Sequence, residues 1–261
     1  MKLLRFSFLI LAFTCFAFSQ NNSLNQTQFN LDSLRFFTSK NNNLQLIFNK
    51  SVLRIVQDSF SFKNLNFKNS TIPSDFNLKN FSIVKDDNGK NFFVRSDLGE
   101  VFSIENDSII RKDFSKRTKA FSGANMIFHQ NKILSFFGYG FFEERNFVIE
   151  FDFQTKQWDK IINDKDSYRP IARRNSIYHK KADKVYFLGG THSNISNPSI
   201  HIYDMMAYDI TNKKFKKMGD LKDKPNFFNI GPKFVYRIDD TKSLFFKNGT
   251  IFLVNFELLN Y

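Results

Sequence analysis

The chain has 261 residues, is 42% hydrophobic and 17% aromatic, and carries a formal net charge of +13. A mean hydropathy of −0.36 excludes a polytopic membrane protein, and the length suits one large β domain. The charge is typical of proteins that bind nucleic acid, but the basic residues form short pairs that would not follow a phosphate backbone, so we expect no nucleic-acid partner. These pairs are Arg173-Arg174, Lys180-Lys181, Lys213-Lys214 and Lys216-Lys217.

The first 19 residues have the pattern of a secretory signal peptide. Lys2 and Arg5 are basic, residues 6–18 form an uncharged apolar stretch, and Ala17-Phe18-Ser19 suits cleavage. The stretch is shorter than the ~20 residues that span a bilayer. We therefore expect a protein that is secreted or held in the cell envelope, in the periplasm or at the cell surface. A membrane anchor and a lipoprotein signal at Cys15 are the alternatives.

Residues 20–261 are predicted to form one all-β domain. Short apolar runs recur about every ten residues, bounded by Asn, Asp, Gly and Lys, and helical periodicity is nearly absent. Turn formers such as Asp86-Asp87-Asn88-Gly89 separate several runs, as tight hairpins require. We expect meandering antiparallel sheets. The clearest predicted strands are 44–48, 52–56, 92–95, 101–104, 126–129, 132–137, 147–153, 184–188 and 252–256.

Two segments, 123–162 and 174–218, repeat one pattern. A hydrophobic strand ends in Phe137-Gly138 in the first and in Gly189-Gly190 in the second. An aromatic-Asp pair follows, and a further aromatic residue comes six positions after the aspartate. The two strands of a hairpin with a polar turn explain this spacing. The residues that mark it are Asp152 with Trp158 and Asp209 with Phe215.

This pattern resembles the Kelch repeat, in which a strand ends in two glycines and is followed by an aromatic-Asp pair, a Thr-Asn-like turn and a tryptophan. Phe137 in place of a first glycine and Phe215 in place of a second tryptophan depart from it. The resemblance implies a β-propeller. In such a fold the glycines let backbones approach, and the late aromatic residue packs between neighbouring blades.

The repeat length sets the expected number of blades. Segments 29–70 and 79–115 have the pattern of diverged blades, and 227–256 that of a partial one. At about 50 residues per repeat, the chain holds about five four-stranded blades. Kelch propellers usually have six or seven, so we expect a ring that is either small or incomplete. Strand-like sequence runs to Tyr261, which suits a C-terminal continuation that tethers the protein to a membrane.

Two enzyme classes follow from the Kelch resemblance. Copper radical oxidases resembling galactose oxidase need a cysteine cross-linked to a tyrosine, but the one cysteine, Cys15, lies in the predicted signal peptide. A Kelch-type sialic-acid mutarotase would need acid-base residues tuned by burial. The charged residues that would supply them, Glu143, Glu144, Arg145, Arg173 and Arg174, lie in predicted loops.

Four histidines are candidates for a metal site. His129 and His179 hold equivalent places in the two repeats, where we expect a hairpin-end residue bonded to backbone. His192 and His201 share one predicted loop without a carboxylate at ligand spacing. We therefore expect no metal, no cofactor and no catalytic residue.

Two loops that follow the second strand of each repeat, 139–145 and 191–201, are the candidate binding surface. Equivalent loops of adjacent blades emerge on one face of a propeller, where aromatic side chains can stack on a ligand and charges can orient it. The alternative is that the aromatic residues pack beneath the loop. The candidate residues are Tyr139, Phe141, Phe142, Glu144, Arg145, Arg174, His192 and His201.

The sequence thus predicts a non-catalytic extracytoplasmic binding module that recognises a glycan or a protein through propeller loops. Two alternatives stay open. One is the sensory ectodomain of a longer membrane signalling protein. The other is a sugar-modifying enzyme such as a mutarotase, with Arg174 and Glu144 as its acid-base groups.

Overall fold

The computed structural model describes the backbone of residues 34–40, 43–48, 51–56, 59–64, 66–67, 81–95, 98–105, 108–114, 122–140, 143–144, 147–161, 176–194, 197–220, 235–237, 242–247 and 250–255. Side chains are described within 81–95, 98–105, 108–114, 122–140, 147–161, 176–190 and 200–220. Strands, turns and one short 3-10 turn, η3 (Lys180–Ala182), make up these residues, which confirms the predicted all-β class. No helix in the described part is long and apolar enough to cross a membrane. The predicted signal peptide, 1–19, lies outside the described residues.

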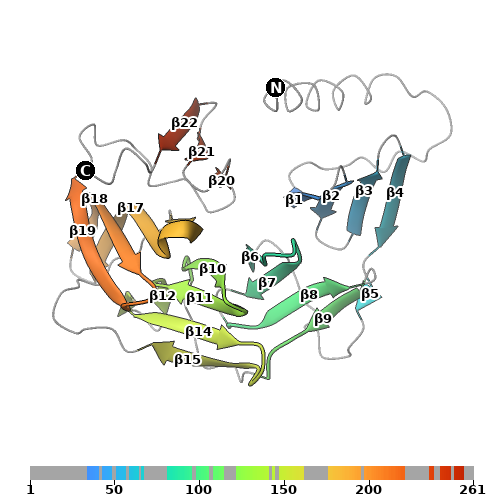
Figure 1. Ribbon diagram of the computed structural model, residues 1–261, viewed down its shortest axis with the longest axis horizontal. Coiled ribbons are helices and arrows are strands. Elements are labelled where there is room, and N and C mark those ends of the chain that lie inside the picture. Colours follow the sequence, from blue (N-terminus) through green and yellow to red (C-terminus); the bar gives the residue numbers. More distant parts are fainter. Residues whose placement is uncertain are drawn as a thin grey trace. The chain divides into compact units, whose positions relative to one another are not determined.

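The first described sheet follows the chain in the order β1-β2-β3-β4 (Figure 1). Leu46 pairs with Leu53, and Leu53 pairs with Phe62, in antiparallel register. The sheet lies within segment 29–70. Its strands are β1 (Leu34–Lys40), β2 (Asn43–Phe48), β3 (Ser51–Val56) and β4 (Ser59–Asn64).

The second sheet, the β6–β9 sheet, has four strands paired antiparallel in chain order and a fifth, β5 (Asn66–Phe67), parallel to β9. Asp86-Asp87-Asn88-Gly89 forms its first turn. The Asp86 carboxylate accepts the N–H of Lys90 at 2.7 Å, and Gly89 has a φ of 83°, as such turn formers allow. The antiparallel strands are β6 (Phe81–Lys85), β7 (Asn91–Arg95), β8 (Val101–Glu105) and β9 (Ser108–Arg111).

The two repeats form two further four-stranded antiparallel sheets. The β10–β15 sheet contains β10 (Asn125–His129), β11 (Lys132–Phe136), β14 (Val148–Asp152) and β15 (Gln157–Ile161). The β16–β19 sheet contains β16 (Ser176–His179), β17 (Lys184–Asn194), β18 (Asn197–Asp209) and β19 (Lys214–Asp220). A small hairpin of β12 (Tyr139–Gly140) and β13 (Glu143–Glu144) connects β11 to β14. The last described sheet is β20 (Val235–Arg237), β21 (Lys242–Lys247) and β22 (Thr250–Asn255).

The last hairpin has the same construction in both repeats. Phe151 pairs with Trp158 across β14 and β15, and Tyr208 pairs with Phe215 across β18 and β19. The six-residue spacing seen in the sequence is thus the span of a hairpin turn. Each aromatic pair is the unit that stabilises neighbouring antiparallel strands.

Aspartate caps close these two turns. Asp152 Oδ1 accepts a hydrogen bond from the backbone N–H of the residue two positions later, at 2.7 Å. Asp209 Oδ1 accepts one from the backbone N–H of the residue three positions later, at 2.8 Å. Lys156 and Lys213 then adopt left-handed backbone, with φ of 58° and 55°. Aspartate favours such turns because its carboxylate bonds its own backbone.

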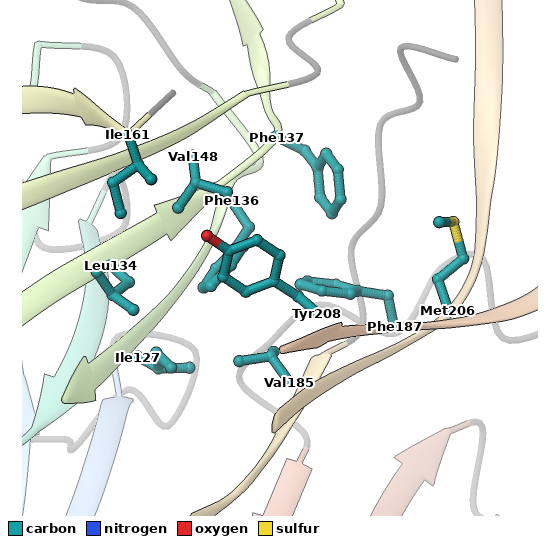
Figure 2. Close-up of a cluster of buried hydrophobic side chains, with 10 residues drawn as sticks. All are labelled: Ile127, Leu134, Phe136, Phe137, Val148, Ile161, Val185, Phe187, Met206 and Tyr208. Atoms are coloured by element: carbon teal, nitrogen blue, oxygen red, sulfur yellow. The ribbon is translucent and has the colours of Figure 1, made fainter. Parts of the chain in front are cut away.

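Three consecutive sheets pack face to face. The first core cluster joins the β6–β9 sheet to the β10–β15 sheet, and the second joins the β10–β15 sheet to the β16–β19 sheet (Figure 2). Neighbouring residues of β11 alternate between the two clusters, Ile133 in the first and Leu134 in the second, because side chains alternate across a strand. Each large apolar side chain buried in this way contributes about 1.5–3 kcal/mol.

The end of the second strand has unusual backbone in both repeats. Phe137 has a φ of 59°, and Gly189, at the equivalent place, has a φ of 55°. Glycine adopts this conformation without strain, whereas a bulky residue does so rarely. The Phe137 ring is 2% exposed and lies 4.9 Å from the Phe187 ring. Burial in the next sheet's core therefore accompanies the strained backbone.

An ionic network is buried at one edge of the β6–β9 sheet. Glu100, 3% exposed in its side chain, lies 3.4 Å from Arg95 and 3.3 Å from Arg111. Arg111 also pairs with Asp113 at 3.1 Å, and Asp113 accepts the N–H of Val101 at 2.9 Å. Burial alone would lower the pKa of Arg111, but the hydrogen bond and charge of Asp113, with the charge of Glu100, raise it.

Candidate functional site

Each four-stranded meander has two unlike ends. Its first and third turns lie at one end, and the connection between its second and third strands lies at the other. We call these the turn end and the hairpin end. In the β10–β15 sheet the hairpin-end connection is residues 137–147. In the β16–β19 sheet it is formed by the ends of β17 and β18, which stay paired with each other.

At the hairpin end of the β16–β19 sheet, β17 and β18 continue as a two-stranded arm, residues 190–194 and 197–202. β16 pairs with β17 only as far as Phe187, and β19 pairs with β18 only from Asp204. The arm begins with Gly190 opposite Ile202, just after a register shift. Residues 191–201, predicted as a loop, are therefore largely strand, because backbone pairing extends the hairpin whatever its polar side chains.

The β12–β13 hairpin occupies the equivalent place in the preceding sheet. Tyr139 pairs with Glu144 in this hairpin. It also forms a β-bridge to Ser122, and the two backbone hydrogen bonds between Tyr139 and Ser122 are each 2.8 Å long. β13 lies next to β17. The first connection therefore lies beside the strand that leads into the second.

Exposed apolar and aromatic groups mark these two connections. Tyr139 is 41% exposed on β12, and Ile200 is 55% exposed on the arm. His201 is also exposed, and its ring lies 6.5 Å from the Tyr203 ring in an edge-on arrangement. Aromatic faces beside polar groups suit the binding of a ligand surface.

The predicted site residues divide into three groups. Tyr139 and His201 are exposed at the hairpin end. Glu144 lies on β13, and His192 lies on β17 opposite Ile200. The cross-strand pair that contains His192 is next to the pair that contains His201. Successive pairs belong to opposite faces of the arm. The remaining candidates, Phe141, Phe142, Arg145 and Arg174, lie outside the described residues.

The turn ends of neighbouring sheets meet through side-chain contacts that the sequence did not predict. His129 Nδ1 lies 2.8 Å from the Tyr178 hydroxyl and 3.4 Å from the Asp183 carboxylate. Lys180 pairs with Asp87, which connects the β16–β19 sheet to the first turn of the β6–β9 sheet. These contacts fasten the turn ends of three consecutive sheets together.

The two repeat-equivalent histidines differ. His179 Nδ1 accepts the backbone N–H of Ala182 at 3.2 Å, as the sequence predicts. His129 instead contacts side chains of the next sheet, because Asp183, with a left-handed φ of 52°, brings its carboxylate within reach. Among the described residues, no group of three His, Cys, Asp or Glu is arranged to hold a metal ion.

Comparison of the sequence with models of known protein families and with curated proteins finds no match. In the two repeats the structure separates a turn end, where aspartates cap the β14–β15 and β18–β19 turns, from a hairpin end with long connections and the exposed rings of Tyr139 and His201. The hairpin end is the candidate binding site.

Proposed function

We propose that the chain is a Kelch-like β-propeller that works outside the cytoplasm as a non-catalytic binding module. Its ligand, a glycan or a protein, binds at the hairpin end. The observation that carries the proposal is that the β12–β13 hairpin and the arm leave equivalent points of consecutive sheets, with β13 next to β17.

Sheet packing supports the propeller. Three consecutive meanders stack face to face through two apolar clusters, as blades do. Trp158 and Phe215 hold equivalent positions, and each contacts the preceding sheet near the end of its second strand. Trp158 donates to the Gly99 carbonyl at 2.7 Å, and the Phe215 ring lies 5.4 Å from the Phe137 ring.

The difference between the two ends favours the hairpin end as the binding face. Turn-end connections are short and closed by their own aspartates, Asp86, Asp152 and Asp209. The hairpin-end connections of the two repeats are longer and expose Tyr139 and Ile200. Rigid scaffolds commonly carry their binding residues on such protruding connections.

Two binding assays test the site. In the first, the purified protein is titrated with a panel of neutral oligosaccharides. In the second, a photo-cross-linking side chain at position 139 is activated in a cell-envelope extract, with position 154, an exposed turn-end residue, as the control. We expect at least one assay to give binding that is lost when residues 191–201 are replaced by Asn-Gly. Binding that survives this replacement, or no binding in either assay, contradicts the proposal.

Two further measurements test the remaining parts of the proposal. Small-angle scattering of the chain without residues 1–19 should give a radius of gyration of about 18 Å for one compact ring, and a clearly larger value contradicts a closed propeller. Conversion of any panel sugar by the purified protein, followed by NMR, contradicts a non-catalytic role.

A further inference from the structure

The β16–β19 sheet gathers lysines that are far apart in the sequence. His179 pairs with Lys184, Lys184 with Asp209, and Asp209 with Lys214, so these residues form one row across the four strands. Cross-strand partners project from the same face of a sheet. Lys184 and Lys214, thirty positions apart, therefore share one face at the turn end.

The two turns beyond this row add more lysines. Lys180 and Lys181 lie in η3, and Lys213 lies in the turn between β18 and β19. The Thr211 hydroxyl donates to the Asp183 carboxylate at 2.7 Å, which holds the two turns together. We call the whole group the lysine patch: Lys180, Lys181, Lys184, Lys213, Lys214 and Lys216.

The carboxylates within the patch are turned toward the backbone and toward the neighbouring sheet. Asp209 accepts the backbone N–H of Asn212 at 2.8 Å and its side-chain amide at 3.0 Å. Asp183 faces Thr211 and His129. Lys181, Lys213, Lys214 and Lys216 are exposed. Lys180 pairs with Asp87, and the four exposed lysines make the outer surface of the patch positive.

Protection of a free sheet edge does not account for the patch. Lysines on an edge strand discourage pairing with other chains, and Lys214 and Lys216 on β19 fit that role. Lys184, however, lies on β17, which pairs with strands on both sides. Lys180 and Lys181 lie in a turn. A ligand-binding role covers all of these positions.

We propose that the lysine patch binds an anionic polysaccharide, one that carries carboxylate or sulfate groups along its chain. Lysines act as compact point charges that pair with such groups without a fixed geometry. The patch contains no arginine, and the large apolar residues exposed in the described part, Phe114, Tyr139 and Ile200, all lie elsewhere. It therefore offers neither a stacking surface for bases nor an apolar wedge for a bilayer.

The patch is a site separate from the hairpin end. The row containing Lys184 lies at the turn end, and the arm extends from the other end of the same two strands, β17 and β18. Loss of one binding activity should therefore leave the other intact. The predicted export of the protein also suits this ligand, because polysaccharides are the abundant polyanions outside cells.

Dextran sulfate is the probe, with uncharged dextran of the same length as its control. We expect the purified protein to bind dextran sulfate with an affinity that falls as salt is raised. The triple variant Lys181→Gln, Lys213→Gln, Lys214→Gln should bind about a hundredfold more weakly, because each lysine beside an anionic surface contributes roughly fivefold. The corresponding Lys→Arg triple variant should retain binding.

A matched variant makes the test specific to the patch. Lys85→Gln, Lys156→Gln and Lys160→Gln remove the same charge from exposed lysines of other sheets, so they should change the affinity little. Equal losses in both Gln variants, or no binding by the wild-type protein, overturn the proposal. Tighter binding of duplex DNA or of phosphatidylserine vesicles than of dextran sulfate overturns the assignment to a polysaccharide.

Discussion

Trp158 donates its indole N–H to the carbonyl oxygen of Gly99 at 2.7 Å, although the two residues lie in different sheets. The indole is 4% exposed and packs in the cluster that joins the β6–β9 sheet to the β10–β15 sheet. One side chain therefore supplies both apolar contact and the hydrogen bond of a buried carbonyl. The equivalent residue of the next repeat, Phe215, supplies apolar contact at the same place.

Replacement of Trp158 by Phe should keep most of the packing but leave the Gly99 carbonyl without its donor. An unsatisfied buried acceptor costs about 1–3 kcal/mol, and we expect a loss in that range in urea unfolding. Trp158→Leu should cost more, since it also removes ring contacts. A Phe variant as stable as the wild type would show that the hydrogen bond contributes nothing.

Substitutions at Phe137 should reverse the usual order of Ala and Gly. Removal of the buried ring costs about 3–5 kcal/mol, but left-handed backbone favours glycine over alanine by about 1 kcal/mol or more. We therefore expect Phe137→Gly to be more stable than Phe137→Ala. At Phe136, in extended strand β11, Phe136→Ala should be the more stable of the pair. The same order at both positions would contradict the backbone argument.

Tyr208→Phe should stabilise the protein. The Tyr208 side chain is 0% exposed, its hydroxyl has no hydrogen-bond partner among the described residues, and burial raises its pKa. Figure 2 shows the ring among apolar side chains, Phe136 and Phe187 included. Removal of a buried unsatisfied hydroxyl should add about 1 kcal/mol to the free energy of unfolding.

The control for Tyr208 is Tyr178, whose hydroxyl lies 2.8 Å from His129 Nδ1. Tyr178→Phe should therefore lower the free energy of unfolding by about 1 kcal/mol. Thermal or urea unfolding of both variants separates the two cases. A loss of stability in Tyr208→Phe would indicate a partner for its hydroxyl in solution.

Glu105 should make stability depend on pH in the acid range. Hydrogen bonds from Lys112 and Lys90 lower its pKa from 4.5 to about 2. A carboxylate with a lowered pKa in the folded state stabilises the fold above its unfolded pKa, and this contribution is lost as pH falls from about 4.5 toward 2. With solvent screening the contribution is about 1 kcal/mol at neutral pH. Glu105→Gln should flatten this part of the stability–pH curve, and an unchanged slope would contradict the assignment.

Glu100→Gln should be strongly destabilising. It removes the carboxylate that lies 3.4 Å from the buried Arg95 and 3.3 Å from the half-buried Arg111, which keeps Asp113 as a partner. Loss of one partner from a buried ion pair costs about 3–5 kcal/mol. Asp220→Asn breaks an exposed pair with Lys217 and should cost less than about 1 kcal/mol. Similar effects of the two substitutions in urea unfolding would show that the Glu100 network is not buried in solution.

The sequence predicted the strands that are apolar and bounded by turn formers. The prediction of 92–95 corresponds to β7 (Asn91–Arg95), and that of 126–129 to β10 (Asn125–His129). It missed most of β18 (Asn197–Asp209), because polar residues such as His201 and Asp204 obscure the alternation. Backbone pairing with β17, which no side-chain pattern reports, holds that strand in place.

The site was predicted less completely than the fold. Exposed residues such as Tyr139 follow from the position of a connection after a strand. The contact of His129 with Asp183 and the row that joins Lys184 to Lys214 depend on register between distant segments. The sequence shows these lysines as separate short pairs. It does not show that two of the pairs lie at the same end of one sheet.

The covering of each sheet by residues that come later in the chain has a consequence during synthesis. Val94 and Val101 of the β6–β9 sheet are covered by Phe151 and Trp158. On a ribosome that adds roughly 5–20 residues each second, Trp158 is made on the order of three to ten seconds after Val101. During that interval the β6–β9 sheet of the nascent chain exposes an apolar face. Strands β14 and β15 cover this face once they have been made. We therefore expect the β6–β9 sheet to need its neighbour before its apolar face is covered.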